Sequence, residues 1–271
     1  MTSPPVVLTI GGSDSGGCYG VQTDLRVFAA RGVHAASVLT VVTAQNTVSL
    51  RAAMPLPVEL VEAQLEAVLD DLSVAAVKTG MLGRVEIIDL VARFAAQGRR
   101  VLARPQRREP AAQGRCPNLV VDPVLVDRHG RSLFDPAVAD AYQSILLPHA
   151  AVTCPNEHEL ALLDVNGAEA LARRIGVPVL VTGGRTGGDE AVDVLWDGTE
   201  PLTLRSPRID TANNAGSGDA LSAHLAAGFA VGLSLRESLT EARSRVLAAL
   251  EGAAGWALGA GPGPLDHRTR P

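Results

Sequence analysis

The residues best placed to do chemistry lie late in the chain, between Asn213 and Asp219. Two glycines flank Ser217, and a run of small residues typical of a buried helix follows. The first turn of a helix offers unpaired backbone N–H groups, and the helix dipole makes that end attractive to an anion. Asp219 falls in this expected first turn. It could take a proton from an attacking hydroxyl while the amides of Gly216, Ser217 and Gly218 hold a phosphoryl group. Alternatively, Asp219 only stabilises the start of the helix.

A second candidate is the glycine-rich segment Gly11–Gly20, which directly follows the first expected strand. Its five glycines would let the backbone approach a ligand closely. The segment matches neither the G-x-G-x-x-G pattern nor the P-loop pattern that ends in Gly-Lys-Ser/Thr. This disfavours a dinucleotide-binding dehydrogenase and a P-loop enzyme.

Polar residues also follow several other expected strands. The segment Thr43–Thr47 could bind the edge of a heterocycle, or it could be an ordinary turn. Lys78, the single lysine of the chain, could neutralise phosphate or extend from a strand end into solvent. Asp122, Asn156 and Glu159 could organise hydrated Mg²⁺ near a nucleotide. Alternatively, Asn156 and Glu159 have the spacing of a helix-capping box.

These segments must be positioned by the elements between them, and the hydrophobic pattern predicts alternating strands and helices. The expected strands are 6–10, 37–42, 75–77, 119–121, 151–153, 179–181, 192–196 and 202–204, and the expected helices are 21–30, 58–69, 85–96, 136–146, 218–231 and 235–258. Continuous apolar strands alternating with helices indicate an α/β protein whose mostly parallel sheet is covered on both faces. Ligands of such sheets bind beyond the carboxyl ends of the strands, where the polar segments fall.

Composition narrows the class of protein. With 271 residues, 46% of them hydrophobic, the chain can build one large core. A net charge of −5 argues against a nucleic-acid partner, and no apolar run is long enough to span a bilayer. Three unclustered cysteines and the absence of a basic signal region favour a cytoplasmic protein. We expect one domain over residues 1–260, with an Arg- and Pro-rich loop insertion at 98–117 and a flexible tail at 261–271.

Taken together, six segments resemble the ribokinase superfamily, and most closely the hydroxymethylpyrimidine and hydroxymethylpyrimidine-phosphate kinases of thiamin biosynthesis. They occur in the family's order between about Val6 and Gly255, and they are 12–24, 43–47, 77–82, 121–124, 155–159 and 216–223. The resemblance implies a three-layer α/β/α fold, ATP with Mg²⁺ as cofactors, a small heterocyclic alcohol as substrate and a homodimer.

The resemblance also implies roles for individual residues. Gln45 would bind the aminopyrimidine, and the glycine-rich loop with Asp24 would line the substrate pocket. The implied substrate-binding residues are Gly12, Asp14, Cys18, Tyr19, Asp24, Gln45 and Met81. Asp122, Thr182 and Gly184 would contact the nucleotide, and Asp122, Asn156 and Glu159 would hold the metal. Asp219 would be the catalytic base, with Gly216, Ser217 and Gly218 forming the anion hole.

The chain departs from the pyrimidine kinases at four places. Asp219 stands where they usually carry Cys, and Thr182 stands where they usually carry Lys. Cys18 and Tyr19 replace a Gly-Ala pair, and Ala215 stands where His is frequent. Because Asp219 is still a base, we expect an ATP-dependent kinase of a pyrimidine that bears a hydroxymethyl group. The alternatives are a pyridoxal or pyridoxine kinase, and a catalytically silent heterocycle-binding protein on the same scaffold.

Overall fold

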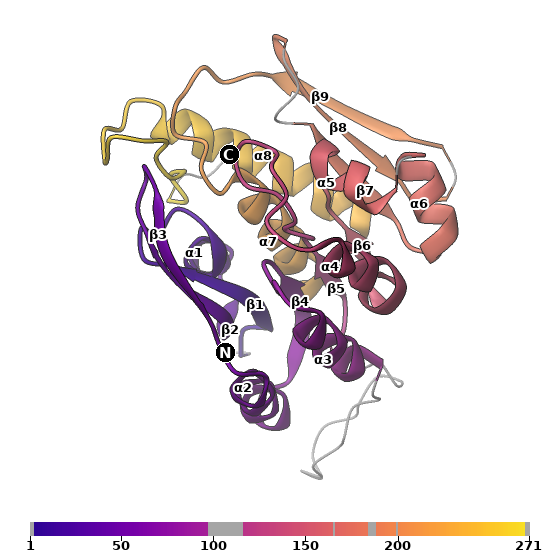
Figure 1. The fold of residues 1–271 in the computed structure, drawn as a ribbon. Coiled ribbons are helices and arrows are strands. Elements are labelled where there is room, and N and C mark those ends of the chain that lie inside the picture. The colour runs from indigo at the N-terminus through magenta and orange to yellow at the C-terminus, as the bar shows by residue number, and fades with distance from the viewer. Residues whose placement is uncertain (1–2, 97–115, 165, 184–187, 199, 269–271) are drawn as a thin grey trace.

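A computed structural model of the chain describes residues 3–96, 116–164, 166–183, 188–198 and 200–268 (Figure 1). The expected insertion at 98–117 therefore lies almost entirely outside the described residues. Within the described part, no helix is both long and apolar enough to cross a membrane.

One nine-stranded sheet forms the centre of the fold, in the order β3-β2-β1-β4-β5-β6-β7-β8-β9. The strands are β1 (Val6–Asp14), β2 (His34–Gln45), β3 (Leu50–Pro55), β4 (Val74–Thr79), β5 (Leu119–Val121), β6 (Val152–Thr153), β7 (Val179–Gly183), β8 (Glu190–Trp196) and β9 (Leu202–Pro207). The six central strands, β2, β1, β4, β5, β6 and β7, run parallel to one another. Strand β3 at one end of the sheet, and β8 and β9 at the other, pair antiparallel. The carboxyl ends of the parallel strands therefore lie along one edge of the sheet. The loops with candidate functional residues follow these strand ends, so they lie at the same edge.

Helices cover both faces of the sheet, which gives the expected three layers (Figure 1). The helices are α1 (Gly20–Ala30), α2 (Val58–Asp71), α3 (Val85–Ala96), α4 (Pro136–Ala141), α5 (Glu157–Leu163), α6 (Ala168–Ile175), α7 (Ser217–Ala230) and α8 (Leu235–Ala253), and a π-helical turn (Tyr142–Leu146) and a 3₁₀ turn (Leu147–His149) follow α4. One hydrophobic core packs α2, α3 and α4 against the sheet, and the other packs α1, α7 and α8. Burial of these two apolar layers is the main favourable term for the fold.

Several elements differ from the sequence-based expectation. Strand β3 was not predicted, because all six of its residues are exposed and their sequence does not alternate between apolar and polar residues. The short helices α5 and α6 were also not predicted as elements. Helix α8 ends at Ala253 rather than at Leu258. Strand β1 extends to Asp14, into the segment expected to be a loop, because glycines let it continue beside β2.

The expected fraying of the tail is wrong for residues 261–268. Leu265 is buried in the core beneath α7 and α8, and the backbone N–H of Asp266 donates to the carbonyl of Ala249 at 3.0 Å. His267 is also buried, and neither of its ring nitrogens has a hydrogen-bond partner in the part of the chain that the structure describes. Burial, with the nearby Arg26 guanidinium, lowers the pKa of His267 to about 4, against a smaller opposite effect of Asp266.

This buried imidazole makes stability depend on pH. The unfolded chain binds the proton of His267 near its ordinary pKa of about 6.5, whereas the folded chain binds it only near 4. The contribution of His267 to the free energy of unfolding should therefore be fully present above pH 6.5. It should be lost as the pH drops toward 4, and the total loss is on the order of 3 kcal/mol. Urea unfolding from pH 7 to pH 4.5 measures this. His267→Leu should reduce the pH dependence without abolishing it, because burial also lowers the pKa of His224, to about 3, whereas His34→Leu, at an exposed histidine, should leave it unchanged. Equal slopes in the wild type and in His267→Leu would refute the assignment.

Candidate active site

The start of α7 meets the glycine-rich segment at the carboxyl edge of the sheet. Gly216, the residue before the helix, has a φ of +80°, a backbone conformation that residues with a side chain rarely adopt. A Cβ atom there would collide with the carbonyl oxygen of Cys18 and would press on the hydroxyl of Thr23. Gly216 is thus required both by its backbone conformation and by the close approach of α1 and its preceding loop.

Asp219 is held by the only lysine of the chain. The Nζ atom of Lys78 lies 3.1 Å from Asp219 Oδ1 and 2.9 Å from Asp24 Oδ1. Lys78 is fully buried, so of the two alternatives considered for it, a lysine that extends from a strand end into solvent is wrong. Thr9, on β1, also donates a hydrogen bond to Asp24. One ammonium group therefore ties β4, α1 and α7 together.

The charges in this cluster are unequal. Burial alone would lower the pKa of Lys78, but Asp24, Asp219 and Asp122 outweigh it and raise that pKa above its ordinary value. Burial raises the pKa of Asp24 to about 6, although Lys78 and the Thr9 hydrogen bond oppose the shift. Because three carboxylates face one ammonium group, the cluster carries an excess of negative charge, which a further bound cation would reduce.

Amides beside Asp219 can bind an anion. The N–H of Ser217 donates to the Asn214 carbonyl at 3.3 Å, and that of Ala220 donates to Gly216 at 2.8 Å. The N–H groups of Gly216, Gly218 and Asp219 have no acceptor among the described residues. Two of the three expected donors, Gly216 and Gly218, are therefore available, whereas the N–H of Ser217 is already bonded and that of Asp219 is an additional donor. They adjoin the Asp219 carboxylate, of which Oδ2 makes no hydrogen bond within the described part.

Asp122, predicted to contact nucleotide and metal, lies at the end of β5 near this cluster. Its Oδ2 accepts a hydrogen bond of 3.0 Å from Ser222 on α7. Burial raises the pKa of Asp122, Lys78 opposes this, and the Asp219 and Glu159 charges raise it further. A buried carboxylate in such a field favours a nearby divalent cation.

Asn156 and Glu159 form the capping box that the spacing allows. The Asn156 side chain accepts from the amides of His158 and Glu159, and the Glu159 carboxylate accepts from the amide of Asn156 at 2.9 Å. The other Glu159 oxygen accepts from Leu125 at 3.3 Å. Both residues thus organise the start of α5. Among the described residues, no group of three or more His, Cys, Asp or Glu side chains is arranged to hold a metal.

The predicted residues of the glycine-rich segment take different places. Asp14 accepts from the amides of Gly16, Cys18 and Tyr19 and so orders the loop from within. Cys18 is buried, and burial raises the pKa of its thiol. Tyr19 is half-buried at the start of α1. Only part of this segment is therefore accessible to a ligand.

Gly12, Met81 and Gln45 lie at neighbouring strand ends. A Cβ atom at Gly12 would press on Val41 and reach the side chain of Met81, which places β1, β2 and the residues after β4 in contact. Gln45 is bonded through its backbone to Ser15, and its half-buried side-chain amide makes no hydrogen bond among the described residues. Its amide is thus available to a heterocycle.

Thr182 lies on β7, and its N–H donates to the Pro155 carbonyl at 3.0 Å, next to Asn156. Gly184 lies outside the described residues. The structure therefore brings together Asp219, Gly216, Gly218 and Asp24 and places Asp122 nearby. The sequence reasoning left Lys78 out of the site. The sequence signal that could have pointed to it is that Lys78 is the only lysine of the chain.

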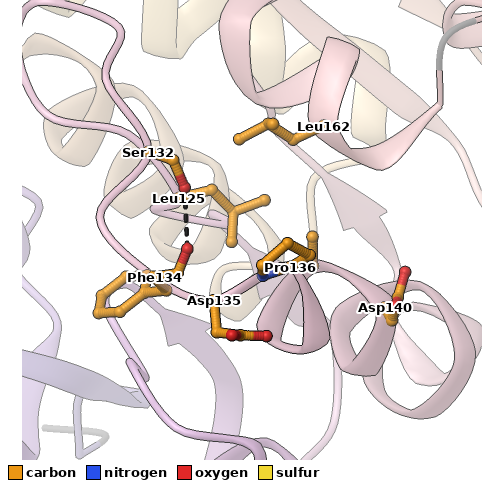
Figure 2. Close-up of a pocket in the computed structure, with 8 residues that line it drawn as sticks. Leu125, Ser132, Phe134, Asp135, Pro136, Asp140 and Leu162 are labelled. Atoms are coloured by element: carbon orange, nitrogen blue, oxygen red, sulfur yellow. Dashed lines mark hydrogen bonds between the residues drawn. The ribbon is translucent and has the colours of Figure 1, made fainter.

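A separate pocket lies between the segment after β5, α4 and α5 (Figure 2). Its lining is Leu125, Ser132, Phe134, Asp135, Pro136, Ala139, Asp140 and Leu162. The Asp135 carboxylate already accepts from Ala137 as the cap of α4, and the Ser132 hydroxyl donates to the Phe134 carbonyl. This pocket contains neither the Lys78 cluster nor the free amides, so the chemistry belongs to the carboxyl edge of the sheet.

Comparisons with a family model, with related sequences and with solved structures all show similarity to kinases. The family model described as phosphomethylpyrimidine kinase matches residues 14–105 and 107–266. A hydroxymethylpyrimidine/phosphomethylpyrimidine kinase of Streptomyces coelicolor is 40% identical, over 98% of this chain and 95% of that protein. The thiamine biosynthetic bifunctional enzyme TH1 of Arabidopsis thaliana is 38% identical, over 97% of this chain and 50% of that protein. A solved ADP complex of Bacillus subtilis pyridoxal kinase is 31% identical with a TM-score of 0.82, and 98% of each chain is covered.

The buried ion pairs yield a stability prediction. In Lys78→Met, Asp24 and Asp219 lose their shared cation, and removing one partner of a buried pair costs about 3–5 kcal/mol. Chemical unfolding at pH 7.5 measures the loss. Lys78→Met/Asp24→Asn removes one of the two stranded charges, so it should be more stable than Lys78→Met alone. A double variant no more stable than the single one would contradict this account of the cluster.

Proposed function

Because this chain belongs to the phosphomethylpyrimidine kinase family, we propose that it is an ATP-dependent kinase of thiamin biosynthesis. Its substrate is 4-amino-5-hydroxymethyl-2-methylpyrimidine or the monophosphate of that alcohol. The observation that carries the proposal is Asp219, held by Lys78 beside the free amides of Gly218 and Asp219. A base and an anion hole at one place suit phosphoryl transfer to an alcohol.

ATP supplies the phosphoryl group: a bond forms between the hydroxymethyl oxygen and the γ-phosphorus, the bond from that phosphorus to the β,γ-bridging oxygen breaks, and ADP leaves. Mg²⁺ would offset the charge of the phosphates. The excess of buried carboxylates around Lys78 fits a divalent cation. Asp122 would hold it with waters, because Mg²⁺ prefers few carboxylates and keeps part of its hydration shell. Glu159 and Asn156 would act indirectly, since their side-chain oxygens already hold the start of α5. Thr182 and Gly184 would contact the nucleotide.

The other roles in the proposed reaction belong to side chains and backbone amides of the protein. Lys78 fixes Asp219 Oδ1, which leaves Oδ2 to accept the proton of the hydroxymethyl group. The Gly218 and Asp219 amides stabilise negative charge on the moving phosphoryl group. Gln45 hydrogen-bonds the aminopyrimidine, with Gly12, Met81 and Tyr19 around the ring. Asp24 acts by anchoring Lys78, and Asp14 acts by ordering the loop that ends at Cys18.

A pyridoxal or pyridoxine kinase is the second candidate. It is favoured by the 31% identity to the Bacillus subtilis pyridoxal kinase over nearly the whole of both chains. That substrate is also a flat heterocycle bearing a hydroxymethyl group, and Asp219 serves either ring. Binding of a heterocycle without ATP consumption would instead indicate a silent binding protein.

A substrate panel with the Asp219→Asn variant tests both the substrate and the mechanism. With ATP and Mg²⁺, we expect kcat/KM to be highest for the pyrimidine alcohol or its monophosphate, and lower for pyridoxal. On the preferred substrate, Asp219→Asn should lower kcat by about 10²–10⁴-fold, because general-base assistance is lost. Its thermal unfolding should show an intact fold. Preference for pyridoxal would support the second candidate, and an unchanged kcat would remove Asp219 from the mechanism.

The protein also forms a homodimer in this proposal, through the hairpin of β2 and β3. All of β3 is exposed at the edge of the sheet. Large apolar side chains are exposed along the hairpin, namely Val42, Val48, Leu50 and Met54. An exposed apolar sheet edge is suited to pairing with a second copy.

Leu50→Asp should therefore convert the dimer to a monomer, because the pairing would bury a charge. Light scattering should give twice 28.1 kDa for the wild type and 28.1 kDa for the variant. Leu162→Asp, at an exposed leucine on α5, is the control and should remain dimeric. A monomeric wild type would rule the dimer out.

A further inference from the structure

The C-terminal segment Gly259–Leu265, here called the brace, touches the two loops that carry the proposed site (Figure 1). We propose that the brace is a positioning element for phosphoryl transfer. It would fix the loop that presents Gln45 to the heterocycle relative to the loop that presents Asp219 to the hydroxyl. This inference rests on the proposed function for the roles of those two residues.

The first contact is with Thr47, two residues beyond Gln45. The N–H of Gly261 donates to Thr47 Oγ1 at 3.2 Å. A Cβ atom at Gly261 would collide with the Thr47 carbonyl oxygen, so the two backbones touch directly. The Arg128 guanidinium also donates to the carbonyls of Thr47 and Val48 at 3.3 and 3.2 Å. The loop after β2 is thus held by both the segment after β5 and the brace.

The second contact is with the loop before α7. The N–H of Ala215 donates to the Gly263 carbonyl at 3.1 Å, one residue before Gly216. A Cβ atom at Gly263 would collide with Asn213 Oδ1. The Asn213 amide nitrogen in turn donates to the Ala253 and Trp256 carbonyls, at 2.7 and 2.9 Å. The approach to the anion hole is therefore fixed to the end of α8.

Burial at its far end keeps the brace in place. Leu265 is 3% exposed within the core of α1, α7 and α8, and Asp266 is bonded to Ala249. Glycines recur at every second position, 259, 261 and 263, and each lies where a side chain would collide with a neighbouring loop. Gly259 and Gly261 lie against Thr47 and Gly263 lies against Asn213, so the absence of side chains at these positions lets the brace contact both loops.

Such a brace matters because the reaction needs exact placement of the hydroxyl. A misplacement of about 1 Å can cost about 10²-fold in rate. Displacing the loop after β2 should mainly weaken binding of the heterocycle. Displacing the loop before α7 should mainly slow the transfer step, because it moves Asp219 and the free amides.

The test compares three Gly→Ala variants with the wild type, using the heterocycle on which the wild type is most active. Gly261→Ala should raise KM for the heterocycle by roughly 10-fold and leave KM for ATP unchanged, and Gly263→Ala should lower kcat by roughly 10–10²-fold. Gly255→Ala is the control, because a Cβ there meets nothing within 4 Å, and it should match the wild type. A thermal transition close to that of the wild type shows that a variant is folded.

Folded Gly261→Ala and Gly263→Ala proteins with wild-type kcat and KM would overturn the proposal. So would an equal rise in both KM values for Gly261→Ala, since that indicates general loosening. If Gly261→Ala does not fold, Thr47→Val decides. It removes the acceptor of the Gly261 N–H at nearly constant volume, and it should raise KM for the heterocycle alone. An unchanged KM in Thr47→Val would then refute the brace. Because the comparison runs on whichever heterocycle is turned over, a wrong pyrimidine assignment does not affect it.

Discussion

The contact of one buried ammonium with two carboxylates determines how this site can be built. Lys78 is the only lysine in the chain, and it is completely removed from water. A charge in that position is tolerated only when partners surround it, and Asp24 and Asp219 are those partners. They come from α1 and α7, on one face of the sheet, whereas Lys78 comes from β4 within the sheet. The sheet and the helix layer that carries Asp219 are therefore held in one arrangement.

In the proposed mechanism, this contact between layers of the fold also acts in catalysis. Asp24 is too deeply buried to line a pocket, so its work is to anchor Lys78. Lys78 then holds one oxygen of Asp219 and leaves the other available. The unequal numbers of carboxylates and ammonium groups leave negative charge at the end of β5, near Asp122. Such a field favours a divalent cation and, with it, the phosphates of a nucleotide. The same charges that stabilise the layers thus prepare the site for its ligands.

The sequence predicted the parallel sheet, the three layers and most of the loops at its carboxyl edge, because apolar periodicity and strand-end polarity are local signals. The capping box of Asn156 and Glu159 was predictable for the same reason. Lys78 was not assigned, since its partners lie 54 and 141 residues away along the chain. Strand β3 was missed because exposed residues carry no periodicity. The tail was expected to be flexible because chain termini usually are, whereas its glycines let it approach the neighbouring loops closely and Leu265 is buried in the core.

The central claim is that a hydroxyl group binds between Asp219 and the free amides of Gly218 and Asp219. A crystal structure with the pyrimidine alcohol and a non-hydrolysable ATP analogue tests it most directly. The account predicts the hydroxyl oxygen within about 2.6–3.2 Å of Asp219 Oδ2, with Lys78 still on Oδ1 and the terminal phosphate facing the two amides. A hydroxyl bound away from Asp219, or an Asp219 turned from Lys78 toward solvent, would contradict it.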